Sequence, residues 1–291
     1  MKMDVTSQMK KYQWFITGII AAVVFIVQNN ESIPGVDVLW AIPLVIIALI
    51  LGGLFILGAG KLGKLAEQRS KKLKNLAEQM GMEFSVEDEW DIGASLSAFD
   101  MFWEADITNV LSGDSEQLGY GEEFEVTVLD CSYVRSASVL ERPLGFGGEN
   151  KTIVQTVICF HSSQLSLPDF SMRPEEWHHK LRSKLGYQDI DFESHPTAVE
   201  FSKKYLLRGK DEQKIRALFT DKVLTFFAAH PSVGNGHLPF WHWSQYEVCV
   251  EGSGDQLILY RAGIGIKPED IPAFMKEGFE VFRVFTSSQP N

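Results

Sequence analysis

Residues 124–135, FEVTVLDCSYVR, and residues 152–161, TIVQTVICFH, are rich in β-branched and aromatic side chains, a composition typical of strands. The residues between them, 136–150, contain one proline and three glycines, which suits the connection of a long hairpin. A second hairpin is predicted from residues 246–251 and 256–261, which flank the turn-forming sequence GSGD. This part of the chain is therefore expected to contain antiparallel strand pairs.

Helical patterns alternate with these strands. The apolar periodicity of helices is found in four segments, at residues 174–185, 196–207, 211–229 and 268–284. Pro174 and Pro268 stand at the first helical position of two of them, each followed by acids that suit the helix dipole. Strand pairs with about four helices on one face predict a soluble α+β domain over residues 82–291. One compact unit is expected, with a border near residues 162–172 as the alternative.

Two apolar stretches precede this domain. Residues 14–27 and 38–60 contain no charged side chain, and about twenty apolar residues span a bilayer core of roughly 30 Å. The sequence therefore predicts a two-span transmembrane α-hairpin in residues 1–60, with spans at about 12–28 and 38–60. A signal peptide is the competing interpretation of the first stretch, but no small-x-small cleavage site precedes Gln28 and a longer stretch follows.

The basic residues predict how this hairpin is oriented. Lysines lie before the first span and after the second, whereas the connecting loop carries Glu31 and Asp37 and no base. By the positive-inside rule both ends of the hairpin face the cytoplasm. The expected protein is multi-pass and is held by the lipid bilayer through two spans, with both termini and the soluble domain in the cytoplasm.

A basic helix is predicted between the hairpin and the soluble domain. Residues 61–80 carry a partial leucine stripe among several lysines, and Gly81 suits a helix stop. We expect this juxtamembrane helix to act as a neck. The alternative is a coiled coil, through which copies of the chain would form a homo-oligomer.

Charge divides the chain at the same border. Residues 1–80 carry nine Lys and Arg against five Asp and Glu, a net charge of +4. The remaining residues carry 18 against 33, a net charge of −15. Phosphate backbones are bound by clustered Lys and Arg, so no nucleic-acid partner is expected for the acidic part.

Short motifs lie at the end of the first apolar stretch and along the second. They are FIVQNNE at residues 25–31, VDVLW at 36–40, Pro43-Leu44 and Gly52-Gly53. With them, residues 12–78 resemble the lipopolysaccharide assembly protein A domain. The resemblance implies a two-span hairpin in the bacterial inner membrane and a role, beside a tetratricopeptide partner, in regulating lipopolysaccharide synthesis. This chain departs from that family by carrying some 210 further residues, so a hairpin that serves only as an anchor is the alternative.

The C-terminal part also carries a likeness. With Asp189-Ile190-Asp191-Phe192 and Lys267-Pro268-Glu269-Asp270, it is similar to uncharacterised bacterial domains of unknown function. This likeness implies no activity and no functional residue.

Three cysteines, Cys131, Cys159 and Cys249, lie far apart in strand-like stretches. No CxxC pair and no neighbouring histidine accompanies them. The sequence therefore predicts buried free thiols in a reducing compartment.

The densest polar group in the sequence lies in YQDIDFESHP, where Asp189, Asp191, Glu193 and His195 alternate with other residues. In an extended segment these four share one face, with alternate Cβ atoms about 6.6 Å apart. A metal ion with oxygen ligands is one hypothesis for them. The alternative is an edge strand whose outer face is charged so that it stays unpaired.

A second candidate is the stretch HPSVGNGHLPFWHW at residues 230–243. Its histidines could approach one another to bind a metal, although zinc sites usually show tighter pairs; they are His230, His237 and His242. Trp241 and Trp243 are predicted either to pack on the core or to contact a protein partner. The pair His178-His179 points in two directions on a helix and is a weaker candidate.

No catalytic motif is recognisable in the chain. The glycines at 145–148 lack the Lys-Ser/Thr of a phosphate loop, and no GxSxG, HExxH or kinase set occurs. Catalytic residues therefore stay unknown, and no cofactor is predicted. The sequence favours a binding or scaffolding module with a protein partner, placed in envelope or lipopolysaccharide homeostasis by the resemblance. The alternative is a membrane-tethered enzyme or metal-binding domain without a recognisable motif.

Overall fold

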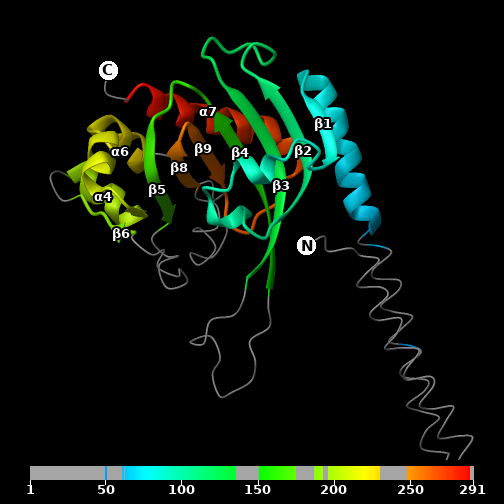
Figure 1. The fold of residues 1–291 in the computed structure, drawn as a ribbon, viewed down its shortest axis with the longest axis horizontal. Coiled ribbons are helices and arrows are strands. Elements are labelled where there is room, and N and C mark those ends of the chain that lie inside the picture. The colour runs from blue at the N-terminus through cyan, green and yellow to red at the C-terminus, as the bar shows by residue number, and fades with distance from the viewer. Residues whose placement is uncertain are drawn as a thin grey trace, which may run out of the picture. The chain divides into compact units, whose positions relative to one another are not determined.

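The structure is a computed structural model of the 291-residue chain. It describes residues 50, 61, 63–135, 151–174, 187–192, 196–229 and 248–288. Met1–Lys71 and Lys72–Asn291 form two compact units. The fold described below is that of the second unit (Figure 1).

One antiparallel sheet of nine strands organises the described part of this unit (Figure 1). The strands are β1 Glu83–Glu87, β2 Asp106–Asp114, β3 Glu125–Arg135, β4 Lys151–His161, β5 Leu167–Pro174, β6 Gln188–Asp189, β7 Tyr205–Gly209, β8 Cys249–Gly254 and β9 Gln256–Tyr260. Their order in space is β1-β2-β3-β4-β9-β8-β5-β7-β6. The hairpin β8–β9 therefore lies between β4 and β5, which brings residues from distant parts of the sequence onto neighbouring strands.

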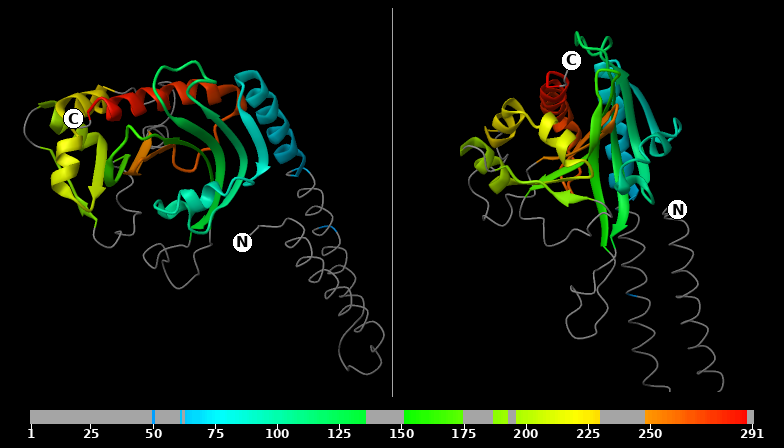
Figure 2. Two further views of the ribbon diagram at one scale, coloured as in Figure 1. Left: turned by 45° about the horizontal axis from the view of Figure 1, so that its top comes forward. Right: turned by 60° about the vertical axis from the view of Figure 1, so that its left-hand side comes forward.

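Helices cover parts of this sheet (Figure 2). The helix α7 lies along one face of the sheet, and α4 and α6 lie near β7 (Figure 2). The helical elements are α3 Ile92–Ser95, η2 Asp100–Phe102, α4 Pro196–Lys204, α5 Glu212–Leu218, α6 Asp221–Ala229, η7 Pro268–Asp270 and α7 Ile271–Thr286.

A helix over residues 63–80 precedes β1 and ends at Gly81, as the sequence predicts. Gly81 has a φ of 72°, a left-handed conformation that glycine adopts without a steric penalty. The Met82 amide donates to the Ala77 carbonyl at 2.9 Å, and the Gly81 amide donates to the Glu78 carbonyl at 3.4 Å. These two bonds form a Schellman motif. It turns the chain into β1, while Leu73 and Ala77 become part of the main core.

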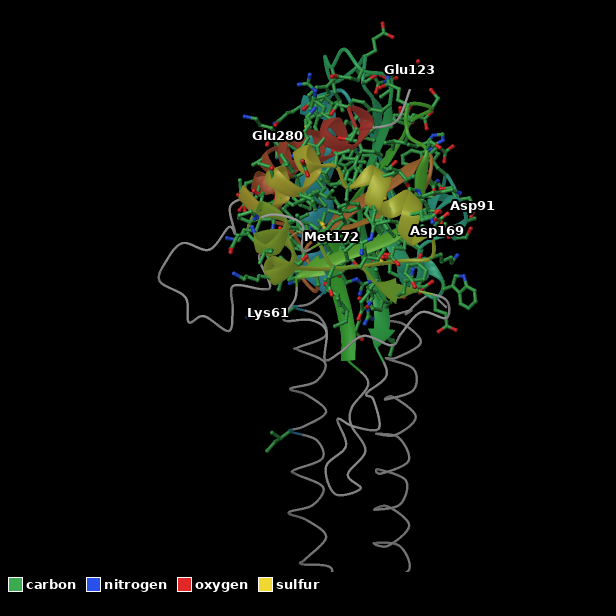
Figure 3. The ribbon with its side chains drawn as sticks, turned by 90° about the vertical axis from the view of Figure 1, so that its left-hand side faces the viewer. Lys61, Asp91, Glu123, Asp169, Met172 and Glu280 are labelled. Atoms are coloured by element: carbon green, nitrogen blue, oxygen red, sulfur yellow. The ribbon has the colours of Figure 1, made fainter. Side chains whose placement is uncertain are left out.

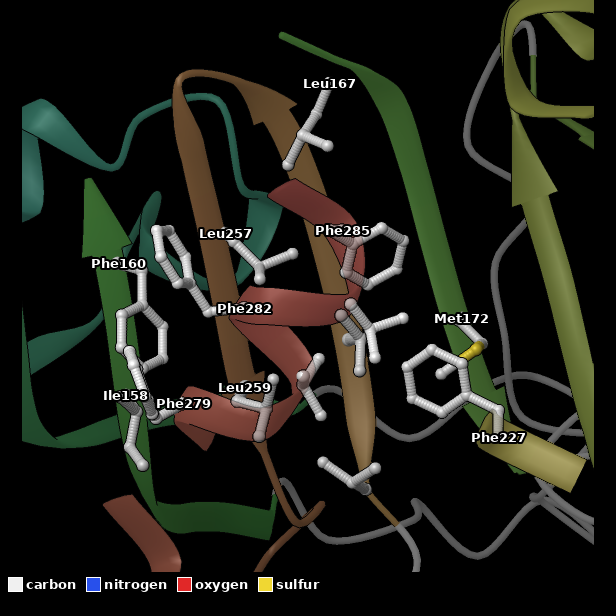
Figure 4. Packing of buried hydrophobic residues seen from close by; sticks show 14 of the residues in the cluster. Ile158, Phe160, Leu167, Met172, Phe227, Leu257, Leu259, Phe279, Phe282 and Phe285 are labelled. Atoms are coloured by element: carbon white, nitrogen blue, oxygen red, sulfur yellow. The ribbon is translucent and has the colours of Figure 1, made fainter. Parts of the chain in front are cut away.

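The main core lies between α7 and the sheet face that we call the core face. Phe279, Phe282 and Phe285 recur at helical spacing on α7 and join this core. Figure 4 shows Phe279 and Phe282 beside side chains of β4 and β9, among them Phe160 and Leu257. Phe285 lies further toward β5, where its ring centroid is 5.5 Å from that of Phe170. The ring centroids of Phe160 and Phe282 lie 5.1 Å apart in a stacked pair. Each fully buried side chain of this size contributes about 1.5–3 kcal/mol, so α7 is the element that fixes the sheet.

A smaller core covers part of the other sheet face. The segment with α3 and η2 contributes Leu96, Phe99 and Phe102, which are buried with strand residues of β3, β4, β8 and β9. All three cysteines belong to this cluster and are buried and free, as predicted. Burial raises the pKa of Cys131 to about 12 and also raises that of Cys159. These two thiols therefore stay protonated and inert at neutral pH.

The predicted strands of both hairpins are confirmed, but they are parts of a larger sheet. β3 and β4 pair without interruption from Glu125–His161 to Arg135–Lys151, and β8 pairs with β9 around a tight turn. The predicted antiparallel pairing holds within each hairpin, and further pairings of β4 with β9 and of β8 with β5 join the hairpins into one sheet. Strand composition identifies strands, but it does not say which of them become neighbours.

Three of the four predicted helices differ from the structure in part. Pro174 ends strand β5, and the rest of the helix predicted at 174–185 lies outside the described residues. The helix predicted at 196–207 ends at Lys204, where β7 begins. The segment 211–229 divides into α5 and α6 around Phe219. The helix predicted at 268–284 is confirmed as η7 and α7.

The membrane predictions need correction. Among the helices that the structure describes, none combines the length and the apolar character needed to cross a bilayer. The predicted spans at 12–28 and 38–60 lie outside the described residues except for Ile50. The described fold is a nine-stranded antiparallel sheet with helices and contains no transmembrane hairpin. The expected fold class, the multi-pass inner-membrane location and the partnership with the bilayer through two spans are corrected accordingly.

The physical reason lies in how the two kinds of helix are recognised. The predicted spans are uncharged apolar stretches long enough to cross a bilayer, whereas α7 buries one side in the core and keeps charges on the other. α7 carries Lys276, Glu277, Glu280 and Arg283 beside its buried phenylalanines. Such a helix packs on a sheet rather than spanning a bilayer.

Candidate functional site

Strand alternation separates two kinds of side chain on β5. Phe170 and Met172 are buried in the main core, so Asp169, Ser171 and Arg173 project to the opposite side. Figure 3 shows Asp169 and Met172, both on this strand. The face opposite the core face is therefore polar at β5, although the α3–η2 cluster makes it apolar at β3 and β4.

Neighbouring strands extend this polar side in a row across the sheet. Ser171 lies opposite Glu251 of β8 and, on its other side, opposite Arg208 of β7. Arg208 in turn lies opposite Asp189 of β6. Side chains directly opposite each other share one face, so β5, β6, β7 and β8 contribute to one polar surface. Tyr260 of β9 joins it through its hydrogen bond to Glu251. We call it the polar face, defined by Asp169, Ser171, Arg173, Asp189, Arg208, Glu251, Ser253 and Tyr260.

A buried ionic network lies at the centre of the polar face. The Arg173 Nη2 donates to Glu251 Oε1 at 2.7 Å, and the Tyr260 hydroxyl donates to the same oxygen at 2.7 Å. The Arg173 Nε donates to the Ser171 hydroxyl at 3.1 Å. Glu251 and Tyr260 are each only 2% exposed, while the Arg173 side chain keeps 23% of its surface exposed. The carboxylate is thus fully buried, and the Arg173 side chain is partly exposed.

The electrostatics of this network fix the charge states of its members. Burial would lower the pKa of the Arg173 guanidinium, but the acidic groups of Tyr260 and Glu251 raise it by more. Burial, reinforced by Glu251, raises the pKa of Tyr260 well above its usual value, although Arg173 opposes this. Arg173 is therefore charged and Tyr260 is a neutral phenol across the physiological range.

A second set of contacts lies beside the network, near the N-terminal end of β5. The carboxylate of Asp169 accepts hydrogen bonds from the Ser253 hydroxyl at 2.7 Å and from Lys210 Nζ at 2.6 Å. Lys210 Nζ also lies 5.7 Å from the ring centre of Tyr187, a cation–π distance. Burial, and then the charges of Asp169, Glu251 and Asp100, raise the pKa of Tyr187.

The network is costly as a source of stability. Removing two charges from water costs several kcal/mol per ion, and their attraction repays this only in part. Apolar residues of similar volume would serve stability at least as well. Ionisable groups with perturbed pKa values also concentrate at functional sites. The polar face is therefore the candidate site that the described residues favour.

The predicted metal group is only partly described. Ile190 and Phe192 are buried and Asp189 and Asp191 are exposed, so the expected alternation holds over these four residues. Asp189 forms an ion pair with Arg208. Glu193 and His195 lie outside the described residues. The described part of the chain contains no group of three His, Cys, Asp or Glu placed to hold a metal ion, and the metal site stays a prediction.

The other predicted site residues lie outside the described residues as well. They are Trp241 and Trp243, together with His178, His179, His230, His237 and His242. Their proposed interaction or metal roles stay predictions.

The sequence did contain a signal for the polar face. In LPDFSMRP, residues 167–174, the acid, the hydroxyl and the guanidinium alternate with two large apolar side chains. In CVEGSG, residues 249–254, Glu251 and Ser253 alternate with Val250 and Gly252. Two short strands with the same alternation indicate one polar and one apolar face. Their pairing with each other could not be inferred from the sequence.

Comparisons with known proteins assign no family. No family model matches the chain, and no curated protein matches it at a significant level. Among solved structures, the crystal structure of the mycobacterial trehalose monomycolate transport factor A, TtfA, matches with a TM-score of 0.45 and 12% sequence identity. The match covers 75% of this chain and 93% of that one. At this TM-score and identity the likeness gives this chain neither a family nor a function.

Proposed function

We propose that this chain is a binding module that recognises a polar ligand on the polar face. One observation carries the proposal: the Arg173–Glu251–Tyr260 network is buried between strands whose other face supplies the apolar core. Stability does not require such a network. Recognition does use it, because buried carboxylates hold guanidinium groups at fixed positions for a ligand.

The charge states favour binding over catalysis. A general acid or base works best when its pKa lies near the operating pH. The pKa of Tyr260 and that of Arg173 are both raised away from that range. Fixed donors and acceptors of this kind orient a ligand without exchanging protons with it.

A ligand panel tests the proposal on the full chain. Polar compounds of anionic, cationic and neutral classes would be screened by thermal shift, and each binder would be mapped by amide hydrogen exchange. We expect at least one binder that slows exchange in β5 and β8 and is recovered chemically unchanged. Binders that protect only other strands would contradict the proposal, and so would turnover of a compound bound on β5 and β8.

The predicted envelope role, protein partner and homo-oligomer rest on the sequence. A role in envelope or lipopolysaccharide homeostasis rests on the resemblance of residues 12–78, of which only 50, 61 and 63–78 are described. A protein partner at Trp241 and Trp243, and a homo-oligomer through residues 61–80, also stay predictions. An envelope role is tested by the detergent sensitivity of a deletion strain.

A further inference from the structure

We infer that Arg173, Arg208 and Ser171 form a binding site for a phosphate group. This inference rests on the proposed function and names the chemical class of its ligand. The three residues come from the adjacent strands β5 and β7 and project from the polar face. The inference follows from the spacing of the three residues, from their unused hydrogen-bond donors, and from the carboxylates that fix the two arginines.

The register of β5 and β7 places Ser171 beside both arginines. Ser171 lies directly opposite Arg208, and Arg173 lies two residues further along β5. Arg173 and Arg208 are thus diagonal neighbours, a relation that separates backbone positions by about 7–8 Å in antiparallel sheets. Long side chains at this separation reach a common small group between them.

Each member of the site has hydrogen-bond donors to spare. Arg173 uses Nε for Ser171 and Nη2 for Glu251, and Arg208 uses Nε for Asp189. Among the described residues, no group accepts from Nη1 of Arg173 or from Nη1 and Nη2 of Arg208. The Ser171 hydroxyl accepts from Arg173, so its own hydrogen is available for a ligand.

Carboxylates hold both guanidinium groups from the side. Glu251 binds Arg173 and Asp189 binds Arg208, which limits the rotamers of both arginines. Their side chains remain 23% and 21% exposed. Asp169 is also near but is engaged by Lys210 and Ser253. Three acids and three bases thus balance, so affinity has to come from directed donors rather than from net positive charge.

The arrangement of donors favours a phosphate over a carboxylate. Guanidinium groups bind both by paired hydrogen bonds. A carboxylate offers two oxygens in one plane, whereas the oxygens of a phosphate point in tetrahedral directions. Two arginines on adjacent strands and the hydroxyl beside them approach a ligand from different directions, which favours acceptors in more than one plane. A free phosphate ion and a phosphate ester, such as a lipid head group carries, share this chemistry.

Titration calorimetry on the full chain tests the inference with inorganic phosphate, glycerol 3-phosphate and acetate as probes. We expect one of the phosphates to bind more tightly than acetate, and the tighter one identifies a free ion or an ester as the source. Arg208→Gln is expected to weaken phosphate binding at least about tenfold, the loss typical of a charged hydrogen bond. Arg208→Lys keeps the charge but lacks the paired donors of a guanidinium. This variant should bind phosphate with intermediate affinity.

Arg283→Gln provides the matched control. Arg283 is an ion-paired arginine on α7, bound to Glu122 and 60% exposed, so its loss removes the same charge elsewhere. Phosphate binding that is weakened equally by both glutamine variants would overturn the inference, as would acetate binding more tightly than either phosphate. A panel ligand that protects β5 and β8 with unchanged affinity in Arg208→Gln would overturn the phosphate site and leave the proposed function standing.

Discussion

At the scale of single residues, the end of β7 depends on the absence of a side chain at Gly209. A Cβ built on Gly209 would lie 2.7 Å from the carbonyl oxygen of Asp169 and would also overlap the side chain of Ile215. Backbone atoms do not yield to such an overlap without strain. Gly209 therefore sets how closely β7 approaches β5, and with it the position of Arg208 on the polar face.

Replacing Gly209 by alanine is expected to destabilise the protein. Overpacking a closely packed site costs about 1–3 kcal/mol, and this site has a backbone atom on one side. Urea unfolding should show a lower midpoint with an unchanged slope. Gly265→Ala is the control, because nothing lies within 4 Å of its Cβ position, and it should stay within about 0.5 kcal/mol of the wild type. Equal stability of the two variants would contradict the close approach of β7 and β5.

At the scale of elements, His161 of β4 links β3 and the turn between β8 and β9 at one end of the sheet. Its Nδ1 lies 3.3 Å from Glu125 of β3 and its Nε2 lies 3.1 Å from Asp255, in the turn between β8 and β9. Burial lowers the pKa of His161, but the hydrogen bonds to Glu125 and Asp255 raise it by more. Its side chain is 51% exposed, so the energy involved is that of a surface ion pair.

The His161 contacts should therefore stabilise the fold in a pH-dependent way. A raised folded-state pKa means that the contribution is fully present below the unfolded value of about 6.5 and is lost as the pH rises through the folded value. Near pH 5.5 the free energy of unfolding of the wild type should exceed that of His161→Gln by a few tenths to about 1 kcal/mol. This difference should shrink above pH 7. Urea titrations at several pH values measure it. A difference that grows with pH would show that the sign is wrong.

The sequence predicts an element well when local residue composition determines it, and poorly when pairing with a distant strand determines it. Residues 124–135 and 152–161 were identified because long runs of β-branched and aromatic residues occur mainly in strands. Residues 205–207 are assigned to the preceding helix by the sequence pattern, because YLL continues its apolar periodicity and only the pairing with β5 makes this segment a strand. The polar face was missed because Arg173 and Glu251 lie 78 residues apart, and no local pattern records such a pairing.

At the scale of the whole molecule, one sheet has two different tasks. Its core face binds α7 and supplies the stability, through residues such as Phe160 and Phe282. Its opposite face changes along the strand order from the apolar α3–η2 cluster to the polar face. The central claim is that the buried network on the polar face is kept for binding and that the fold does not depend on it.

The free energy of unfolding of the triple variant Arg173→Met, Glu251→Leu, Tyr260→Phe tests this claim most directly. Removing one partner, as in Glu251→Leu alone, leaves a desolvated guanidinium and should cost about 3–5 kcal/mol. Replacing all three groups by apolar side chains removes the cost of desolvation, so the triple variant should be at least as stable as the wild type while losing ligand protection of β5 and β8. A triple variant less stable than Glu251→Leu alone would show that the network holds the fold together, and would contradict the claim.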